Sequence, residues 1–167
     1  HFERIAILER VHDMGDQGPD DCDAPREFLA EMERIHSRVE ELLREDRGDE
    51  AFRLLAEVSS RCKACGCRDP AFAEIFRAHA DVAGQLGGGQ QLRLGCLATA
   101  LEYATARERY SVVSCMLAAE LLSATLEAAQ QGGACAEGLA RAEAVAREHF
   151  CGVYGAEEGG VFEALNP

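Results

Sequence analysis

The string of residues most able to do chemistry is a CxxCxC motif over residues 62–67. It places three thiols close together, but a structural zinc site takes four ligands. A fourth would have to come from Cys22, His79 or Cys96, and no second CxxC lies at zinc-ribbon or finger spacing. The first two cysteines also continue an apolar helix stripe. We therefore expect no bound cofactor and keep a metal- or thiol-dependent site only as the alternative, with Cys62, Cys65 and Cys67 as its residues.

Other catalytic patterns are weak or missing in the sequence. A reactive cysteine pair is favoured at a helix N-terminus, whereas residues 62–65 end a predicted helix, where the dipole disfavours a thiolate. Glu33 and His36 form one ExxH, and a di-iron site needs that motif on two helices. His79 and His149 fall on or beside apolar faces, where histidines usually have structural roles. We assign no catalytic residue and predict that the chain is not an enzyme.

The elements that carry these residues read as helices. A first helix is predicted over residues 2–14, followed by an acidic linker over 16–23, in which Asp23 can cap the next helix. The second helix has one apolar stripe at spacings of three and four, formed by Phe28, Met32, Ile35, Val39 and Leu42. Gly48-Asp49 is expected to break the pattern. A third helix follows and ends at Gly66, with an apolar face of Ala51, Leu54, Leu55, Val58, Cys62 and Cys65.

The pattern recurs after Asp69-Pro70, which suits an N-cap followed by proline at the first helical position. A helix with apolar residues from Phe72 to Leu86 is expected to turn at 87–89 and return through Leu94 to Ala104. The helix from Tyr110 to Ala129 is apolar almost all round, so we predict it to be the most buried element. A last helix runs from Cys135 to Phe150. Glycines are expected to loosen the chain after it: Gly152, Gly155, Gly159 and Gly160.

These segments predict an all-α fold of three antiparallel helix hairpins with a period near 40 residues. The last hairpin has Leu121-Leu122, Gly132-Gly133, Leu139, Ala146, Phe150 and Tyr154-Gly155. In these positions it resembles a tetratricopeptide repeat of the long, kinesin-light-chain-like kind, and the middle hairpin is a looser copy. The resemblance implies a short solenoid of stacked hairpins that binds another protein. A plain helix bundle remains the alternative, because the first-helix aromatic and the inter-repeat proline of that family are mostly absent.

Length and composition favour one all-helical domain over residues 1–167, with an N-terminal helix and linker over 1–23, hairpins over 24–155 and a tail over 156–167. The chain is 47% hydrophobic and lacks tryptophan. A start without methionine suggests a larger parent protein. No uninterrupted apolar run approaches the roughly 20 residues of a spanning helix, and no export signal is visible. We therefore expect an intracellular, cytoplasmic protein whose eight cysteines are mostly free thiols.

The formal net charge of −13 argues against partners that are themselves polyanions. Nucleic acid and anionic membrane surfaces both need clustered lysine and arginine, so neither is an expected partner. We therefore interpret the chain as a non-enzymatic scaffold domain that binds a partner helix or peptide, through a basic or amphipathic segment. Its candidate contacts are three acidic residues of the second predicted helix: Glu33, Glu40 and Glu41.

Overall fold

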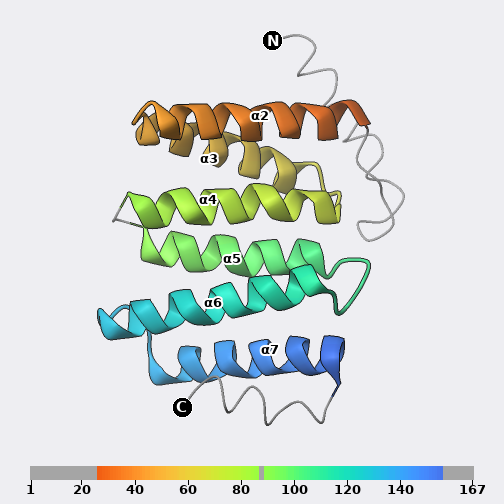
Figure 1. Cartoon of the computed structure of the whole chain (residues 1–167), viewed down its shortest axis with the longest axis vertical. Coiled ribbons are helices and arrows are strands. Elements are labelled where there is room, and N and C mark those ends of the chain that lie inside the picture. The colour runs from red at the N-terminus through yellow and green to blue at the C-terminus, as the bar shows by residue number, and fades with distance from the viewer. Residues whose placement is uncertain (1–25, 87–88, 156–167) are drawn as a thin grey trace. The chain divides into compact units, whose positions relative to one another are not determined.

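The structure of the chain, a computed structural model, describes residues 26–86 and 89–155 (Figure 1). The predicted helix over 2–14, the acidic linker and the C-terminal tail lie outside the described residues. Every regular element in the described ranges is helical, which confirms the all-α prediction. These elements are α2 (Arg26–Arg44), α3 (Gly48–Ala64), the short 3-10 helix η2 (Pro70–Phe72), α4 (Ala73–Gln85), α5 (Gln90–Ala104), α6 (Val112–Gln130) and α7 (Ala136–Tyr154).

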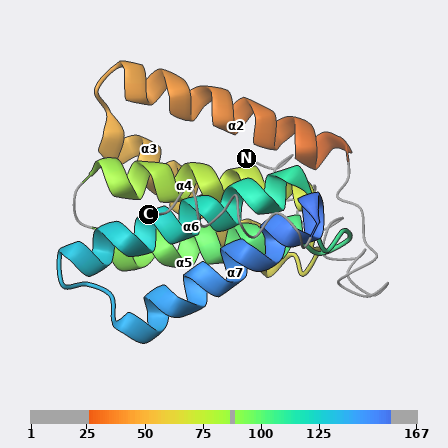
Figure 2. The same ribbon diagram turned by 60° about the horizontal axis from the view of Figure 1, so that its bottom comes forward.

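The chain divides into two compact units, His1–Arg107 and Glu108–Pro167. In the first unit, α2 packs against α3, α3 against α4 and α4 against α5 (Figures 1 and 2). In the second unit, α6 packs against α7. The consecutive helices of each predicted hairpin are therefore in contact. Their stacking as a tetratricopeptide-like solenoid, and the grouping of the whole chain as one domain, stay predictions.

Local backbone chemistry sets the ends of the helices in the first unit. The expected break at Gly48-Asp49 lies slightly earlier, because α3 already begins at Gly48 and the turn is made by Asp46, with φ 60°. Aspartate tolerates this left-handed conformation better than most residues. Gly66 adopts φ 71° just after α3, as its predicted role as a helix stop requires. The Asp69 side chain accepts a hydrogen bond from the Ala71 N–H, which confirms the predicted cap.

The core of the first unit centres on four aromatic rings. Phe28 from α2 meets Phe72 edge to face at 5.3 Å between ring centroids, and Phe76 stacks on Tyr103 at 4.9 Å. Burial raises the pKa of Tyr103 to about 12, and its hydroxyl lies 3.5 Å from the Cys62 carbonyl. Because these rings come from α2, η2, α4 and α5, one cluster fixes the four elements together.

The prediction that the helix beginning near Tyr110 is the most buried element is wrong. The helix α6 buries six of its 19 residues, whereas α4 buries seven of 13. Val112, Val113 and Met116 are 57%, 49% and 48% exposed. The all-round apolar pattern predicted burial on several sides, but within its unit α6 buries a stripe of mostly small residues against α7: Ser114, Leu117, Ala118, Ala124, Thr125 and Ala128.

By length and composition alone, α6 could cross a membrane, and it is the one such helix among the described residues. Core helices of soluble proteins meet the same criterion. The expectation that no segment is suited to spanning was based on uninterrupted apolar runs, and Glu120 and Glu127 interrupt this one. The second unit therefore has an apolar helix, and its composition does not tell a membrane-spanning helix from a core helix.

Candidate functional site

The most site-like surface in the first unit is a hollow of about 600 Å³ between α2 and the start of α4, which we call the α2–α4 groove. Its apolar part comes from the buried side chains of Met32 and Ile75 and the half-buried Leu29. Exposed Glu33 and Glu74 stand on opposite helices, and the half-buried His36 lies one turn beyond Glu33. The remaining lining residues are Ser37 and Ala71.

Helical spacing explains how one sequence supplies both the apolar and the acidic parts of this groove. On α2, the stripe that contains Met32 turns into the core, so its neighbour Glu33 falls at the edge of the buried face. On the other side, the Asp69 cap fixes where the next helices begin, and Glu74 lies in the first turn of α4. A carboxylate in a first helical turn also interacts favourably with the helix dipole.

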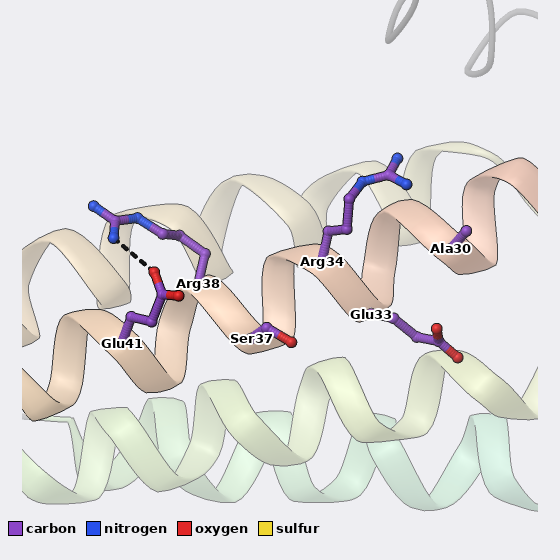
Figure 3. Close-up of a pocket in the computed structure, with 6 residues that line it drawn as sticks. All are labelled: Ala30, Glu33, Arg34, Ser37, Arg38 and Glu41. Carbon is purple, nitrogen blue, oxygen red and sulfur yellow. Dashed lines mark hydrogen bonds and ion pairs between the residues drawn. The ribbon is translucent and has the colours of Figure 1, made fainter.

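A second hollow, of about 520 Å³, adjoins the groove along the polar side of α2 and shares Glu33 and Ser37 with it (Figure 3). Figure 3 shows Glu33 extending on the side of α2 nearer the neighbouring helix, while Arg34 points the other way. The Arg38 guanidinium donates a hydrogen bond of 2.9 Å to Glu41. Because its charges are mixed, this hollow has less net negative potential than the groove beside it.

The three glutamates predicted as partner contacts all lie exposed on α2, but their surroundings differ. Glu33 lines both hollows, and among the described residues it makes no hydrogen bond or ion pair. Glu41 lines only the second hollow and pairs with Arg38. Glu40 lines neither hollow, and its carboxylate lies 3.7 Å from the His36 imidazole. Glu33 is therefore the one best placed to meet a cation from outside.

The alternative site consists of the three cysteines at and just after the end of α3. All three are buried, and they are not all in the same oxidation state. Cys62 and Cys65 are free thiols, while Cys67 is disulfide-bonded. Burial raises the pKa of the Cys62 thiol to about 12 and also raises the pKa of the Cys65 thiol. Both thiols are thus protonated at neutral pH, and a protonated thiol is a poor nucleophile and a poor metal ligand. The described part of the chain holds no group of three or more histidine, cysteine or acidic side chains arranged to bind a metal.

The cysteine prediction is confirmed for most of the described chain, since six of these residues are free thiols. Cys62, Cys65 and Cys96 are buried, as expected of small apolar residues, whereas Cys135 is exposed. It caps the N-terminus of α7, where the Gly138 N–H donates to its sulfur at 3.4 Å and lowers the pKa of the thiol. The last helix was expected to start at Cys135, and it begins one residue later, at Ala136.

Two buried serine–histidine pairs were not predicted. The Ser59 hydroxyl lies 3.1 Å from Nδ1 of His79, and the Ser114 hydroxyl lies 3.1 Å from Nδ1 of His149. Each serine also donates to a nearby backbone carbonyl, so the arrangement matches a histidine N–H donating to a serine oxygen. Neither pair lines the two hollows on α2. Both histidines are buried, as expected of histidines on or beside apolar faces.

The residues of the groove that sequence analysis missed are those on its second wall. Ile75 was expected only as part of a helix face, and Ala71 and Glu74 were not considered. A helical pattern shows which residues share a face of one helix, but not which face of another helix lies opposite. No family model, no curated protein and no solved structure matches this chain.

Proposed function

We propose that this chain is a non-enzymatic protein-interaction domain that binds an amphipathic helix of another protein in the α2–α4 groove. The observation that carries the proposal is an apolar floor, formed by Leu29, Met32 and Ile75, between two exposed carboxylates, Glu33 and Glu74. An amphipathic helix inserts apolar side chains into such a groove. Lysine or arginine beside those apolar anchors would meet the carboxylates.

The size of the groove specifies how much of a partner helix it accepts. A hollow of about 600 Å³ lies in the range of binding pockets that hold a small ligand. It has room for two or three large side chains, not for a whole helix. Side chains three or four residues apart lie on one helix face, so we expect apolar anchors at that spacing. The partner's contact segment then needs about two helical turns.

Charge supports a basic partner over an acidic one. The net charge of −13 gives the chain a negative field that attracts cations, and complementary charge speeds the encounter of two proteins. Glu33 offers its carboxylate without first breaking an ion pair with another described residue. Glu40 and Glu41 both lie about two turns further along α2 than Glu33. They belong to the proposal as outer contacts, each at the cost of a contact it already makes.

The finer parts of the proposal concern architecture and location. In a tetratricopeptide-like solenoid, neighbouring hairpins form a continuous concave surface, and a groove between the first and second hairpins would be one segment of it. The contacts of α3 with α4 join these two hairpins in the first unit. We place the domain in the cytoplasm, because six of the described cysteines are free thiols. The disulfide of Cys67 would there belong to the transient, redox-sensing kind.

The proposal is tested with a fluorescent synthetic helix that has leucines on one face and lysines on the flanks of that face. Fluorescence anisotropy measures its dissociation constant for the full chain. Glu33→Lys should weaken binding about three- to tenfold, because it replaces attraction with repulsion at a partly desolvated edge. Glu102→Lys is the matched control, since it makes the same charge change at an exposed position of α5 outside the groove.

Equal weakening by Glu33→Lys and Glu102→Lys would mean that only the overall charge matters and would overturn the groove as the binding site. A peptide of the same composition with its leucines scattered around the helix serves as the probe control. If it binds as tightly as the amphipathic peptide, the apolar floor has no role and the proposal fails.

A further inference from the structure

The disulfide of Cys67 indicates which part of the chain lies near the α2–α4 groove. The other described cysteines, six in all, are free, and the sequence has eight cysteines. The remaining cysteine is Cys22, which stands four residues before α2 begins. Cys67 in turn stands four residues before Ala71, a lining residue of the groove. A bond between these two sulfurs would bring the N-terminal part of the chain close to the groove, which Ala71 lines.

The sequence of residues 2–14 suits an occupant of this groove. Drawn as a helix, the segment has two unlike halves. One half carries Glu3, Glu9, Arg10 and Asp13 with Phe2 and Ala6, and the other carries the larger aliphatic side chains Ile5, Ile7, Leu8, Val11 and Met14. Apart from His12, the charged residue on the aliphatic half is Arg4. A cation among apolar side chains matches a groove with an apolar floor and two carboxylates at its edges.

We propose that residues 2–14, held by a disulfide between Cys22 and Cys67, occupy the α2–α4 groove and compete with a partner helix for it. From Cys22, the seven residues back to Gly15 can span about 23 Å when extended, so the segment reaches any part of the groove. The tether makes docking intramolecular, so even weak contacts give a high occupancy. The competition, but not the docking itself, rests on the proposed function.

The tether is reversible by thiol–disulfide exchange. The two thiols of Cys22 and Cys67 each lose a proton, and the two electrons released reduce a small disulfide, such as oxidised glutathione, to two thiols. Excess dithiol reverses the exchange. Reduction removes the tether and leaves the docking segment joined to α2 only through the main chain. A partner would then compete with a segment of lower effective concentration.

The pairing is tested on the unreduced full chain by proteolysis and mass spectrometry after alkylation of free thiols. A peptide with Cys22 linked to one with Cys67 is expected, and the six other cysteines should be alkylated. Recovery of Cys22 and Cys67 in alkylated form after incubation with oxidised glutathione would overturn the tether.

Docking is tested without any partner, by NMR of the full chain labelled at its methionine methyl groups. The three methionines report on three places: Met14 on the segment, Met32 on the groove floor, and Met116 on α6 in the other unit. Leu8→Glu puts a carboxylate on the aliphatic half and should shift the Met32 signal while leaving Met116 in place. Ala6→Glu adds the same group to the opposite half and should shift neither.

A Met32 signal that does not move in Leu8→Glu would overturn docking, provided that the unchanged Met116 signal and circular dichroism show a folded chain. Competition is measured separately, with the fluorescent amphipathic peptide. Leu8→Glu and Cys22→Ser should each tighten peptide binding at least threefold, while Cys135→Ser, which removes an exposed free thiol, should not. If Met32 responds but the peptide fails to bind any variant, the docking stands and the proposed function fails.

Discussion

At the scale of single residues, the two buried histidines couple stability to pH. Burial lowers the pKa of both His79 and His149 below the ordinary value of about 6.5. For His79 the nearby Lys63 lowers it further, and for His149 the opposing effect of Glu148 is smaller than that of burial. Each histidine also packs in a T-shaped arrangement with an aromatic ring, Phe52 for His79 and Tyr110 for His149.

We therefore predict that the free energy of unfolding falls as the pH is lowered from about 6.5. In this range the unfolded chain binds protons that the folded histidines resist, so the stability present above pH 6.5 is lost as the pH falls through the folded pKa values. Urea unfolding at about pH 7.5 and about pH 5.5 measures the difference. The double variant His79→Asn, His149→Asn should show a smaller difference, and an unchanged difference would assign the effect to other groups.

Gly152 shows how one small residue sets the approach of two segments in the second unit. The sequence placed it in a loosened tail, but α7 continues through it to Tyr154. A Cβ atom at Gly152 would overlap the ring of Tyr110. That ring is held in place, because its hydroxyl donates a 2.9 Å hydrogen bond to Glu148 and its edge meets His149.

Gly152→Ala should consequently destabilise the second unit by about 1–3 kcal/mol, the usual cost of overpacking. Gly138→Ala is the matched control in the same helix, since a Cβ there makes only ordinary contact with Cys135. Alanine is the better helix former, so the control should be stabilising or neutral by up to about 1 kcal/mol. Thermal unfolding followed by circular dichroism compares the two variants, and equal effects would contradict the close approach.

At the scale of helices, the sequence predicted the positions of the helices well. It predicted their burial and their packing partners less well. Periodic apolar stripes and caps such as Asp69 are local, and they located α2 to α7 closely. The burial of α6 and the second wall of the groove depend on which helix faces lie together, which a stripe does not specify. In α6, apolar residues occur on the contact face and on the exposed face alike. The pattern therefore could not tell core positions such as Leu117 from exposed ones such as Val112.

This correction changes which leucine of α6 matters for stability. Leu117 is 2% exposed, whereas Leu126 is 38% exposed in the same helix. Leu117→Ala should cost about 2–5 kcal/mol, the range for a core leucine. Leu126→Ala should stay within about 0.5 kcal/mol, as for surface positions. Chemical denaturation of both variants decides the matter, and similar losses at the two sites would contradict the packing of α6 against α7 described above.

At the scale of the whole molecule, charge decides how a partner reaches the groove, while the apolar floor decides how long it stays. The net charge of −13 acts over a distance, and salt screens it with a Debye length of about 8 Å at physiological ionic strength. Burial of apolar side chains against Met32 and Ile75 is short-ranged and is not weakened by simple salts at moderate concentration. The two effects therefore separate in the kinetics of binding.

We predict that the association rate constant of the amphipathic basic peptide falls about tenfold or more between low and high salt, as for other electrostatically assisted encounters. The dissociation rate constant should change much less, because it reflects close contacts in the groove. Stopped-flow fluorescence over a salt series measures both constants. Met32→Ala should act in the opposite sense, raising the dissociation rate and sparing association. An association rate insensitive to salt would show that the acidic surface does not guide the partner, even if the groove still binds it.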